Sequence, residues 1–264
     1  MSQPDWHKHF INETPDPGTV SCVWLGQAGY LFKTDRGTTL LLDPYLTDYA
    51  EMMWGLKRIV PPAFDYTDWA PDILLSTHWH EDHLDLPVVK HYMTQPGVTL
   101  VGSFASIVRS TSWGWPHERA ISLSAGESVD IGDVSIEATF ARHETPEAPA
   151  PDAIGFLLTL SGRTIWNVGD TEYDARVFPP GPDAPEVMIT PINGVGGNLD
   201  VDEAALLAWK TQPTVVIPNH YNMWAPEGFG PGATLDPEQF KGTLIRLGGG
   251  PTVRVLTVGE IITL

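Results

Sequence analysis

Short apolar runs bounded by glycine or proline recur along the chain and predict many short strands. The first half opens with three such runs, at residues 19–26, 29–34 and 38–45. Gly26, Gly29 and Gly37 separate or follow them, which favours a meander of antiparallel strands. A long loop with one short helix is expected from 46 to 71. The run "DILLST" at 72–77 then predicts a buried strand.

Helical segments alternate with strands in the rest of the first half. We expect a helix over 86–97, from Pro87 to the Pro96–Gly97 pair, and another over 104–114. The run at 98–103 between them predicts a strand. Apolar and polar residues alternate from 134 to 143, and this predicted strand ends at His143.

The second half repeats this order of elements. A hairpin is predicted through Ser161 and Gly162, strands are expected at 187–192 and 214–220, and helices at 201–211 and 234–248, with Asp236 as N-cap of the last. Each half thus contains strands followed by helices. This order favours two sheets packed face to face with helices outside. We expect one domain over 1–264 with pseudo-symmetric halves of about 1–135 and 136–264.

Composition supports a globular chain with a full core. Hydrophobic residues make up 42% of the 264 residues, and the single cysteine, Cys22, lies in an apolar run and is expected to be a small core residue. No window approaches the ~18 consecutive apolar residues of a membrane span. The first ten residues have no apolar stretch after a basic one, so we expect no secretory signal and a cytoplasmic location.

The charge balance narrows the class of partner. Lys and Arg number 15 against 33 Asp and Glu, a formal net charge of -18. Such a surface repels phosphate backbones, so no nucleic acid partner is expected. We expect a small-molecule substrate and leave a homo-oligomer open.

The stretch "LLSTHWHEDHLD" at 74–85 carries three of the nine histidines. In an extended segment His78 and His80 point to the same side and form a chelating pair. Asp82 and His83 follow the expected end of the strand, where a turn can direct them to a neighbouring site. Imidazole and carboxylate ligands suit Zn²⁺ or Mn²⁺. One short loop cannot supply all the ligands of two ions, so further ligands are expected later in the chain.

Three candidate ligands come at the ends of later strands. His143 ends the run "SIEATFARH", Asp170 ends "RTIWNVGD", and His220 ends "VVIPNH". Strand ends at one edge of a sheet hold side chains rigidly, which a metal site requires.

These motifs resemble those of the metallo-β-lactamase fold superfamily. "THWHEDHLD" matches its HxHxDH signature, and "GDT" and "PNHYNMW" follow in the expected order. Together with "WLGQAGYLFKT", "LLDPYLTD" and "VGDTEYD", they make the chain similar to the L-ascorbate-6-phosphate lactonase group of that superfamily. The resemblance covers most of the chain.

The resemblance implies an α/β fold, a four-layer αββα sandwich with two divalent ions in a cleft at the sheet edges. One ion would be held by His78, His80 and His143. The other would be held by Asp82, His83 and His220, with Asp170 bridging the two. All seven are therefore candidate metal ligands.

Two such ions, Zn²⁺ or Mn²⁺, share a water molecule and stabilise its hydroxide, which attacks a carbonyl carbon or a phosphorus. The second ion offsets the developing negative charge. Asp82 and His220 are the expected catalytic residues, and Asp82 can also take up or orient the proton of the water. We expect a lactonase-like, metal-dependent hydrolase acting on a lactone or ester of a small polar molecule. The alternatives are a phosphodiesterase and a non-catalytic metal-binding module.

Other residues near these motifs are weaker candidates for the site, because a purely structural role explains several of them equally well. Asp43 either caps a turn with Pro44 or orients a ligand histidine from behind. Asn219, Tyr221 and Trp224 flank His220 and are candidate substrate contacts, although packing explains the two aromatic residues equally well. The loop at 193–198 is expected at the rim of the cleft.

Overall fold

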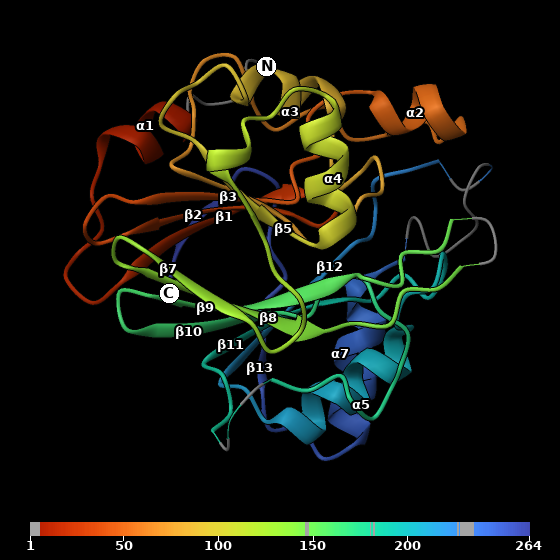
Figure 1. Cartoon of the computed structure of the whole chain (residues 1–264). Helices are drawn as coiled ribbons and strands as arrows, with labels where there is room; N and C mark the ends of the chain where they lie inside the picture. Colours follow the sequence, from red (N-terminus) through yellow and green to blue (C-terminus); the bar gives the residue numbers. More distant parts are fainter. Residues whose placement is uncertain (1–5, 146–147, 180, 182, 226, 228–234) are drawn as a thin grey trace.

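The computed structural model describes residues 6–145, 148–179, 181, 183–225, 227 and 235–264. Figure 1 shows four layers: a layer of helices, two sheets face to face, and a second layer of helices. The predicted αββα sandwich is confirmed. Because both sheets are covered on both faces, most of their strands are buried on both sides.

The first sheet has the strand order β14-β1-β2-β3-β4-β5-β6. The predicted meander is present, because β2 pairs antiparallel with both β1 and β3. From β3 to β6 the strands run parallel. The bounds in chain order are β1 Val20–Gly26, β2 Gly29–Thr34, β3 Thr39–Leu42, β4 Ile73–Ser76, β5 Thr99–Gly102, β6 Ala120–Ser122 and β14 Ile261–Thr263.

The second sheet has the order β13-β12-β11-β10-β9-β8-β7. Its β9–β10 hairpin turns at Ser161 and Gly162, as predicted, and both residues have positive φ. From β10 to β13 the strands run parallel. The bounds are β7 Ser128–Ile131, β8 Val134–Phe140, β9 Ile154–Leu160, β10 Arg163–Asn167, β11 Val187–Pro191, β12 Val215–Asn219 and β13 Thr252–Val253.

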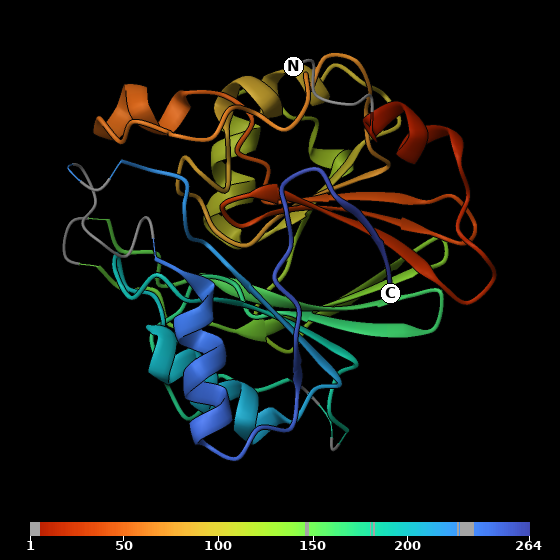
Figure 2. The same cartoon turned by 180° about the vertical axis from the view of Figure 1, so that it is seen from behind.

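The chain changes sheets twice. It passes from the first sheet to the second between β6 and β7, and the last strand, β14, returns to pair with β1. Figure 2 shows this C-terminal segment rising from the second layer of helices to the first sheet. The two ends of the described chain therefore both contribute to the first half of the sandwich.

Within the described ranges, α1, α3 and α4 lie over the outer face of the first sheet with α2 to one side, and α5 and α7 lie over the second sheet (Figure 1). The short helix expected in the long loop is α2, and Asp236 caps α7 by accepting from the Glu238 backbone amide. The predicted helix at 86–97 is shorter in the structure and ends at Tyr92, four residues before Pro96. The bounds are α1 Trp6–Asn12, α2 Tyr49–Trp54, α3 Leu86–Tyr92, α4 Phe104–Ser112, η1 His117–Arg119, α5 Val201–Thr211 and α7 Pro237–Arg246.

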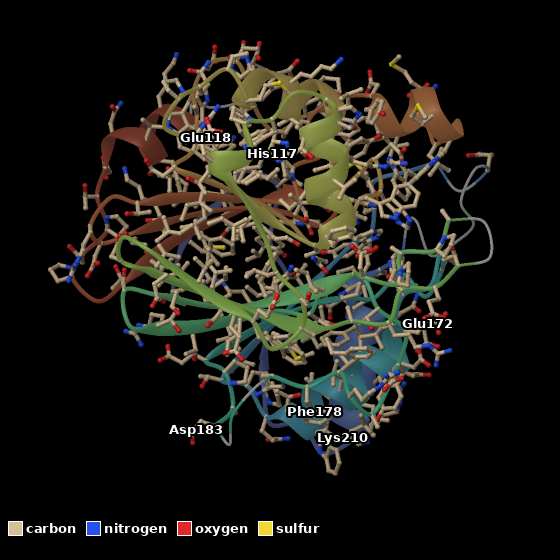
Figure 3. The ribbon with its side chains drawn as sticks, viewed as in Figure 1. His117, Glu118, Glu172, Phe178, Asp183 and Lys210 are labelled. Atoms are coloured by element: carbon tan, nitrogen blue, oxygen red, sulfur yellow. The ribbon has the colours of Figure 1, made fainter. Side chains whose placement is uncertain are left out.

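Strand β1 shows how the layers share the core. Cys22 faces the second sheet and packs in the cluster that contains Phe156, whereas Val23 and Leu25 face α3 and pack in the cluster that contains Val88. Cys22 is fully buried, as expected for a core residue, and burial raises the pKa of its thiol. Figure 3 shows side chains filling the space between the sheets. No helix of the described segments is long and apolar enough to cross a membrane.

Candidate metal centre

Four strands end at one edge of the sandwich, and each is followed by a predicted ligand. His78 comes two residues after β4 and His220 directly after β12, while His143 and Asp170 come three residues after β8 and β10. The two sheets are joined at this edge, because the Ile154 amide donates to the Thr77 carbonyl at 3.1 Å. The fold therefore brings all seven predicted ligand side chains together.

Three buried imidazoles form the first group. His80 Nδ1 lies 2.9 Å from His78 Nε2 and 3.2 Å from His143 Nε2. A ring nitrogen carries either one proton or one lone pair, so His80 Nδ1 can form a hydrogen bond with only one of these two neighbours. The three ring nitrogens therefore cannot all be satisfied by one another. A cation that accepts all three lone pairs fits this arrangement. These are the residues that the resemblance assigns to one ion.

A second group consists of Asp82, His83 and His220, which the resemblance assigns to the other ion. Asp82 Oδ2 lies 3.4 Å from His83 Nε2 and 3.5 Å from His220 Nε2. All three side chains are buried, and among the described residues His83 Nε2 has no hydrogen-bond partner. Both groups therefore suit a divalent cation.

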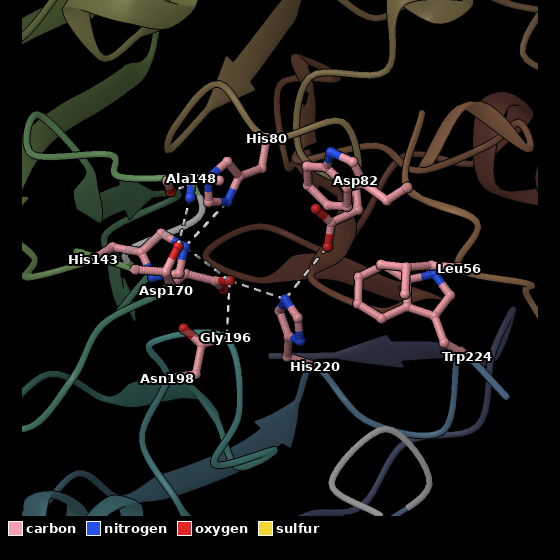
Figure 4. Close-up of a pocket in the computed structure, with 12 residues that line it drawn as sticks. Leu56, His80, Asp82, His143, Ala148, Asp170, Gly196, Asn198, His220 and Trp224 are labelled. Carbon is pink, nitrogen blue, oxygen red and sulfur yellow. Dashed lines mark hydrogen bonds and ion pairs between the residues drawn. The ribbon is translucent and has the colours of Figure 1, made fainter. Parts of the chain in front are cut away.

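Asp170 lies between the two groups, as the bridging assignment requires. Its Oδ2 atom is 3.0 Å from His220 Nε2, 3.3 Å from His83 Nε2 and 3.9 Å from His143 Nε2. Figure 4 shows Asp170 between His143 and His220. The same oxygen accepts a hydrogen bond from Asn198 Nδ2 at 2.9 Å, which fixes the carboxylate.

The far nitrogen of several ligand histidines is also engaged. His83 Nδ1 lies 3.0 Å from Asp43 Oδ2, His143 Nδ1 lies 3.0 Å from the Gly197 carbonyl, and His80 Nε2 lies 2.9 Å from the Ala148 carbonyl. Such contacts fix the ring orientation and the tautomer of a ligating histidine. Asp43 was expected either to cap a turn or to orient a ligand histidine. Its contact with His83 Nδ1 is the one that the second interpretation requires.

Burial sets the protonation of the first group. It lowers the pKa of His78 well below the usual range, that of His80 to about 4, and that of His143. All three rings are therefore neutral at pH 7, which is the form that binds a metal.

Ion pairs set the protonation of the second group. Burial opposes the charge on His220, but Asp170 and Asp82 outweigh it and raise its pKa to about 9. Burial likewise opposes ionisation of the two carboxyls, but His83 and His220 outweigh it and hold their pKa well below the usual range. Without a metal ion, protons on the imidazoles thus balance the buried carboxylates.

A cavity of about 350 Å³ opens over both groups. His80, Asp82, His143, Asp170 and His220 line its floor, whereas His78 and His83 are not among the lining residues. The other lining residues are Trp54, Leu56, Trp224, Thr145, Ala148, Gly196 and Asn198, and Figure 4 shows Leu56 and Trp224 on the side away from Ala148. Two residues of the predicted rim loop at 193–198 thus line the cavity.

The three candidate substrate contacts are placed differently. Trp224 lines the cavity, but Asn219 and Tyr221 do not. Asn219 is still part of β12, and the Tyr221 ring lies 5.3 Å from the ring of Trp24, towards the core. His220 and Asn222 have positive φ, so the chain turns at both and the side chains do not follow one face.

Two polar residues behind the ligands could not be singled out from the sequence. Gln27 Nε2 donates to Asp82 Oδ2 at 2.9 Å, and Asn198 donates to Asp170. Gln27 lies in the tight β1–β2 turn with a φ of 52°. In the sequence, the only indication of a role for Gln27 is its place in the short turn between two apolar strands, and this indication is weak.

Comparisons with known proteins agree with this architecture. The sequence model of the family described as "Beta-lactamase superfamily domain" matches residues 21–220. A protein of Polynucleobacter asymbioticus named "UPF0173 metal-dependent hydrolase" is 30% identical over 225 residues, covering 78% of this chain and 75% of that protein. A Shigella boydii protein named "Probable L-ascorbate-6-phosphate lactonase UlaG" is 24% identical over 84% of this chain and 76% of its own length.

Solved structures show the same fold at low identity. Igni18, titled a novel metallo hydrolase, from Ignicoccus hospitalis has a TM-score of 0.70 at 24% identity, over 93% of this chain and 98% of that one. The metallo-beta-lactamase fold protein YhfI from Bacillus subtilis has a TM-score of 0.67 at 14% identity, over 93% and 99%.

Proposed function

The chain belongs to the β-lactamase superfamily domain family, and from this we propose that it is a metal-dependent hydrolase that opens a lactone or cleaves an ester of a small molecule. One observation carries the proposal. Two groups of buried ligand atoms, joined by Asp170, lie under one cavity that is open to a small molecule. The lactone is supported by the similarity to the probable lactonase.

Divalent ions held by the two groups would supply an activated water and positive charge for a developing oxyanion. His78, His80 and His143 would hold one ion, and Asp82, His83 and His220 the other. The neutral first group and the ionised carboxylates already have the protonation that ligation requires.

The chain's own residues would orient the reacting groups. Gln27 donates to Oδ2 of Asp82 and fixes this carboxylate, which leaves Oδ1 to orient or accept the proton of the attacking water. His220 faces both Asp82 and Asp170 from the end of β12 and lies on the floor of the cavity. Asn198 donates to Oδ2 of Asp170 and would hold this carboxylate in place beside both groups of ligands.

A hydrolysis screen with defined Zn²⁺ and Mn²⁺ loading tests the proposal. Purified protein is offered lactones, carboxylic esters, thioesters and phosphodiesters, with the metal-free protein as control. We expect metal-dependent turnover of lactones or esters. Turnover of phosphodiesters alone would identify the alternative reaction, and no turnover with two bound ions per chain would leave a metal-binding module.

A further inference from the structure

Part of the cavity lining is apolar. It consists of Trp54, at the end of α2, Leu56 two residues later, and Trp224 after β12; we call these three residues the apolar wall. Figure 4 shows Leu56 and Trp224 on the side of Asp82 and His220, away from His143 and Ala148. Trp54 is 38% exposed, and its ring lies 5.5 Å from that of His80. The wall therefore stands directly beside the candidate metal ligands.

A ring contact and backbone hydrogen bonds hold the Trp224 part of the apolar wall in place. The rings of Trp224 and Tyr45 lie 6.2 Å apart in an edge-to-face contact. Backbone hydrogen bonds tie the two segments of the wall together, from Ile59 to the Met223 carbonyl and from Ala225 to the Lys57 carbonyl. Trp224 is therefore held by its ring contact and by the backbone bonds of the residues on either side of it.

Among the described residues, no Lys or Arg side chain lines this space, and none of the residues outside the described ranges is Lys or Arg. Arg58 is buried, and its guanidinium donates to the carbonyls of Tyr45, Thr47 and Val60. Lys57 is exposed and is not part of the lining.

An anionic group on the substrate, away from the scissile bond, would therefore find no charged partner here. Arg and Lys side chains are common phosphate binders in proteins, and a charge placed against apolar side chains is unfavourable. The formal net charge of -18 adds repulsion at longer range. An uncharged alkyl or aromatic group, in contrast, gains about 25 cal/mol per Å² that it buries on such a surface.

We propose that the substrate carries an uncharged apolar group that packs on Trp54, Leu56 and Trp224, while its lactone or ester carbonyl faces Asp82 and His220. This proposal rests on the proposed function and names its substrate class. It differs from the phosphorylated lactone in the name of the Shigella relative and from the polar substrate expected from the sequence. Trp54 and Leu56 are then residues that determine specificity.

The chain-length dependence of hydrolysis tests the substrate class. Metal-loaded protein is given a series of γ-lactones whose alkyl side chain grows from none to six carbons, and one γ-lactone whose side chain ends in phosphate. We expect kcat/KM to rise about fourfold per added methylene until the wall is filled. We also expect the phosphorylated lactone to fall below its uncharged counterpart of equal length. A flat series or a preference for the phosphate would overturn the inference.

Three variants assign the effect to the wall. Trp54→Ala is expected to reduce the ratio of kcat/KM between long-chain and short-chain lactones about tenfold or more. Met52→Ala is the matched control, because Met52 is an apolar residue of the same helix that is 80% exposed and outside the lining. Lys57→Ala tests the nearby cation. Both should leave the ratio unchanged, and a loss of activity in Lys57→Ala towards the phosphorylated lactone alone would point to charge recognition instead.

A binding measurement separates this inference from the proposed reaction. Titration calorimetry of metal-loaded protein with alkyl carboxylates, from butanoate to octanoate, should show affinity rising with chain length in wild type and much less in Trp54→Ala. If no ester is hydrolysed but this trend holds, the proposed reaction is wrong and the apolar wall remains a ligand site. If esters are hydrolysed and neither kcat/KM nor affinity depends on chain length, the reaction stands and the wall proposal fails.

Discussion

The imidazole of His83 and the carboxylate of Asp43 lie side by side at the bottom of the site, with Nδ1 and Oδ2 3.0 Å apart and both side chains fully inaccessible to solvent. Asp43 follows β3, and it also accepts hydrogen bonds from the Thr77 amide and hydroxyl at 2.8 and 2.7 Å. One carboxylate therefore fixes both the loop that leaves β4 and a candidate ligand of that loop.

Replacement of this carboxylate should weaken one metal site and leave the fold intact. Asn is tolerated at the φ of 41° found at Asp43, so Asp43→Asn keeps the backbone but loses one acceptor. We expect affinity for the ion at Asp82, His83 and His220 to fall roughly 10–100-fold, as for other residues behind metal ligands. Calorimetric Zn²⁺ titration measures this.

Asp35→Asn provides the control, because Asp35 is a loop carboxylate that bonds to Gly18 and Ser161 on another part of the chain. Unchanged Zn²⁺ affinity at both sites of Asp43→Asn would show that this carboxylate does not act on the metal.

Removal of one ligand from the first group should remove one ion. His80 Nδ1 faces both His78 and His143, so His80→Ala leaves two of three ligands. We expect about one ion fewer per chain and hydrolysis reduced by at least about 100-fold. His117→Ala is the matched control, since His117 is an exposed histidine of η1 (Figure 3). Full activity with unchanged metal content in His80→Ala would contradict the metal mechanism itself.

The sequence was most informative where local pattern and chemistry coincide. The apolar runs predicted most of the strands, and ligand-type residues at their ends predicted which side chains meet. Gln27 and Asn198 were missed because each acts through contact with a carboxylate more than 25 residues away, which no local pattern reports. Asn219 and Tyr221 were expected at the cavity because they flank His220. The left-handed turn at His220 sends them elsewhere.

The stability of the metal-free protein should decline in alkaline solution. The pKa of His220 is raised from its usual 6.5 to about 9, so the stabilisation from its ion pairs is complete below pH 6.5 and disappears as the pH rises through about 9. The pKa of His83 is shifted in the same direction. The free energy of unfolding should therefore fall by about 3 kcal/mol over this window.

Urea denaturation at pH 6, 7.5 and 9 in the presence of a chelator measures this change. Zn²⁺-loaded protein serves as the comparison, because a bound ion replaces the imidazole protons and should remove most of the dependence. Stability that rises from pH 6.5 to 9 without metal would show that the two histidines are not held in their charged form.

The backbone at Gly169 should be as important to the site as the ligands themselves. Gly169 has a φ of +74° and precedes Asp170, and a Cβ atom there would lie 2.6 Å from the Ile154 carbonyl oxygen. Ile154 in turn bonds to Thr77, next to His78. Ala at position 169 must therefore displace either Asp170 or the β9 backbone that joins the two sheets.

Gly162 has a nearly equal φ of +79° with nothing within 4 Å of its Cβ position, so Gly162→Ala has the same backbone penalty without the clash. That penalty is about 1–2 kcal/mol. We expect Gly169→Ala to lose about 1–3 kcal/mol more than Gly162→Ala in urea denaturation, as overpacking does, and also to weaken Zn²⁺ binding, which Gly162→Ala should not change. Equal stability and equal Zn²⁺ affinity in the two variants would mean that the close approach of Gly169 to β9 does not position Asp170.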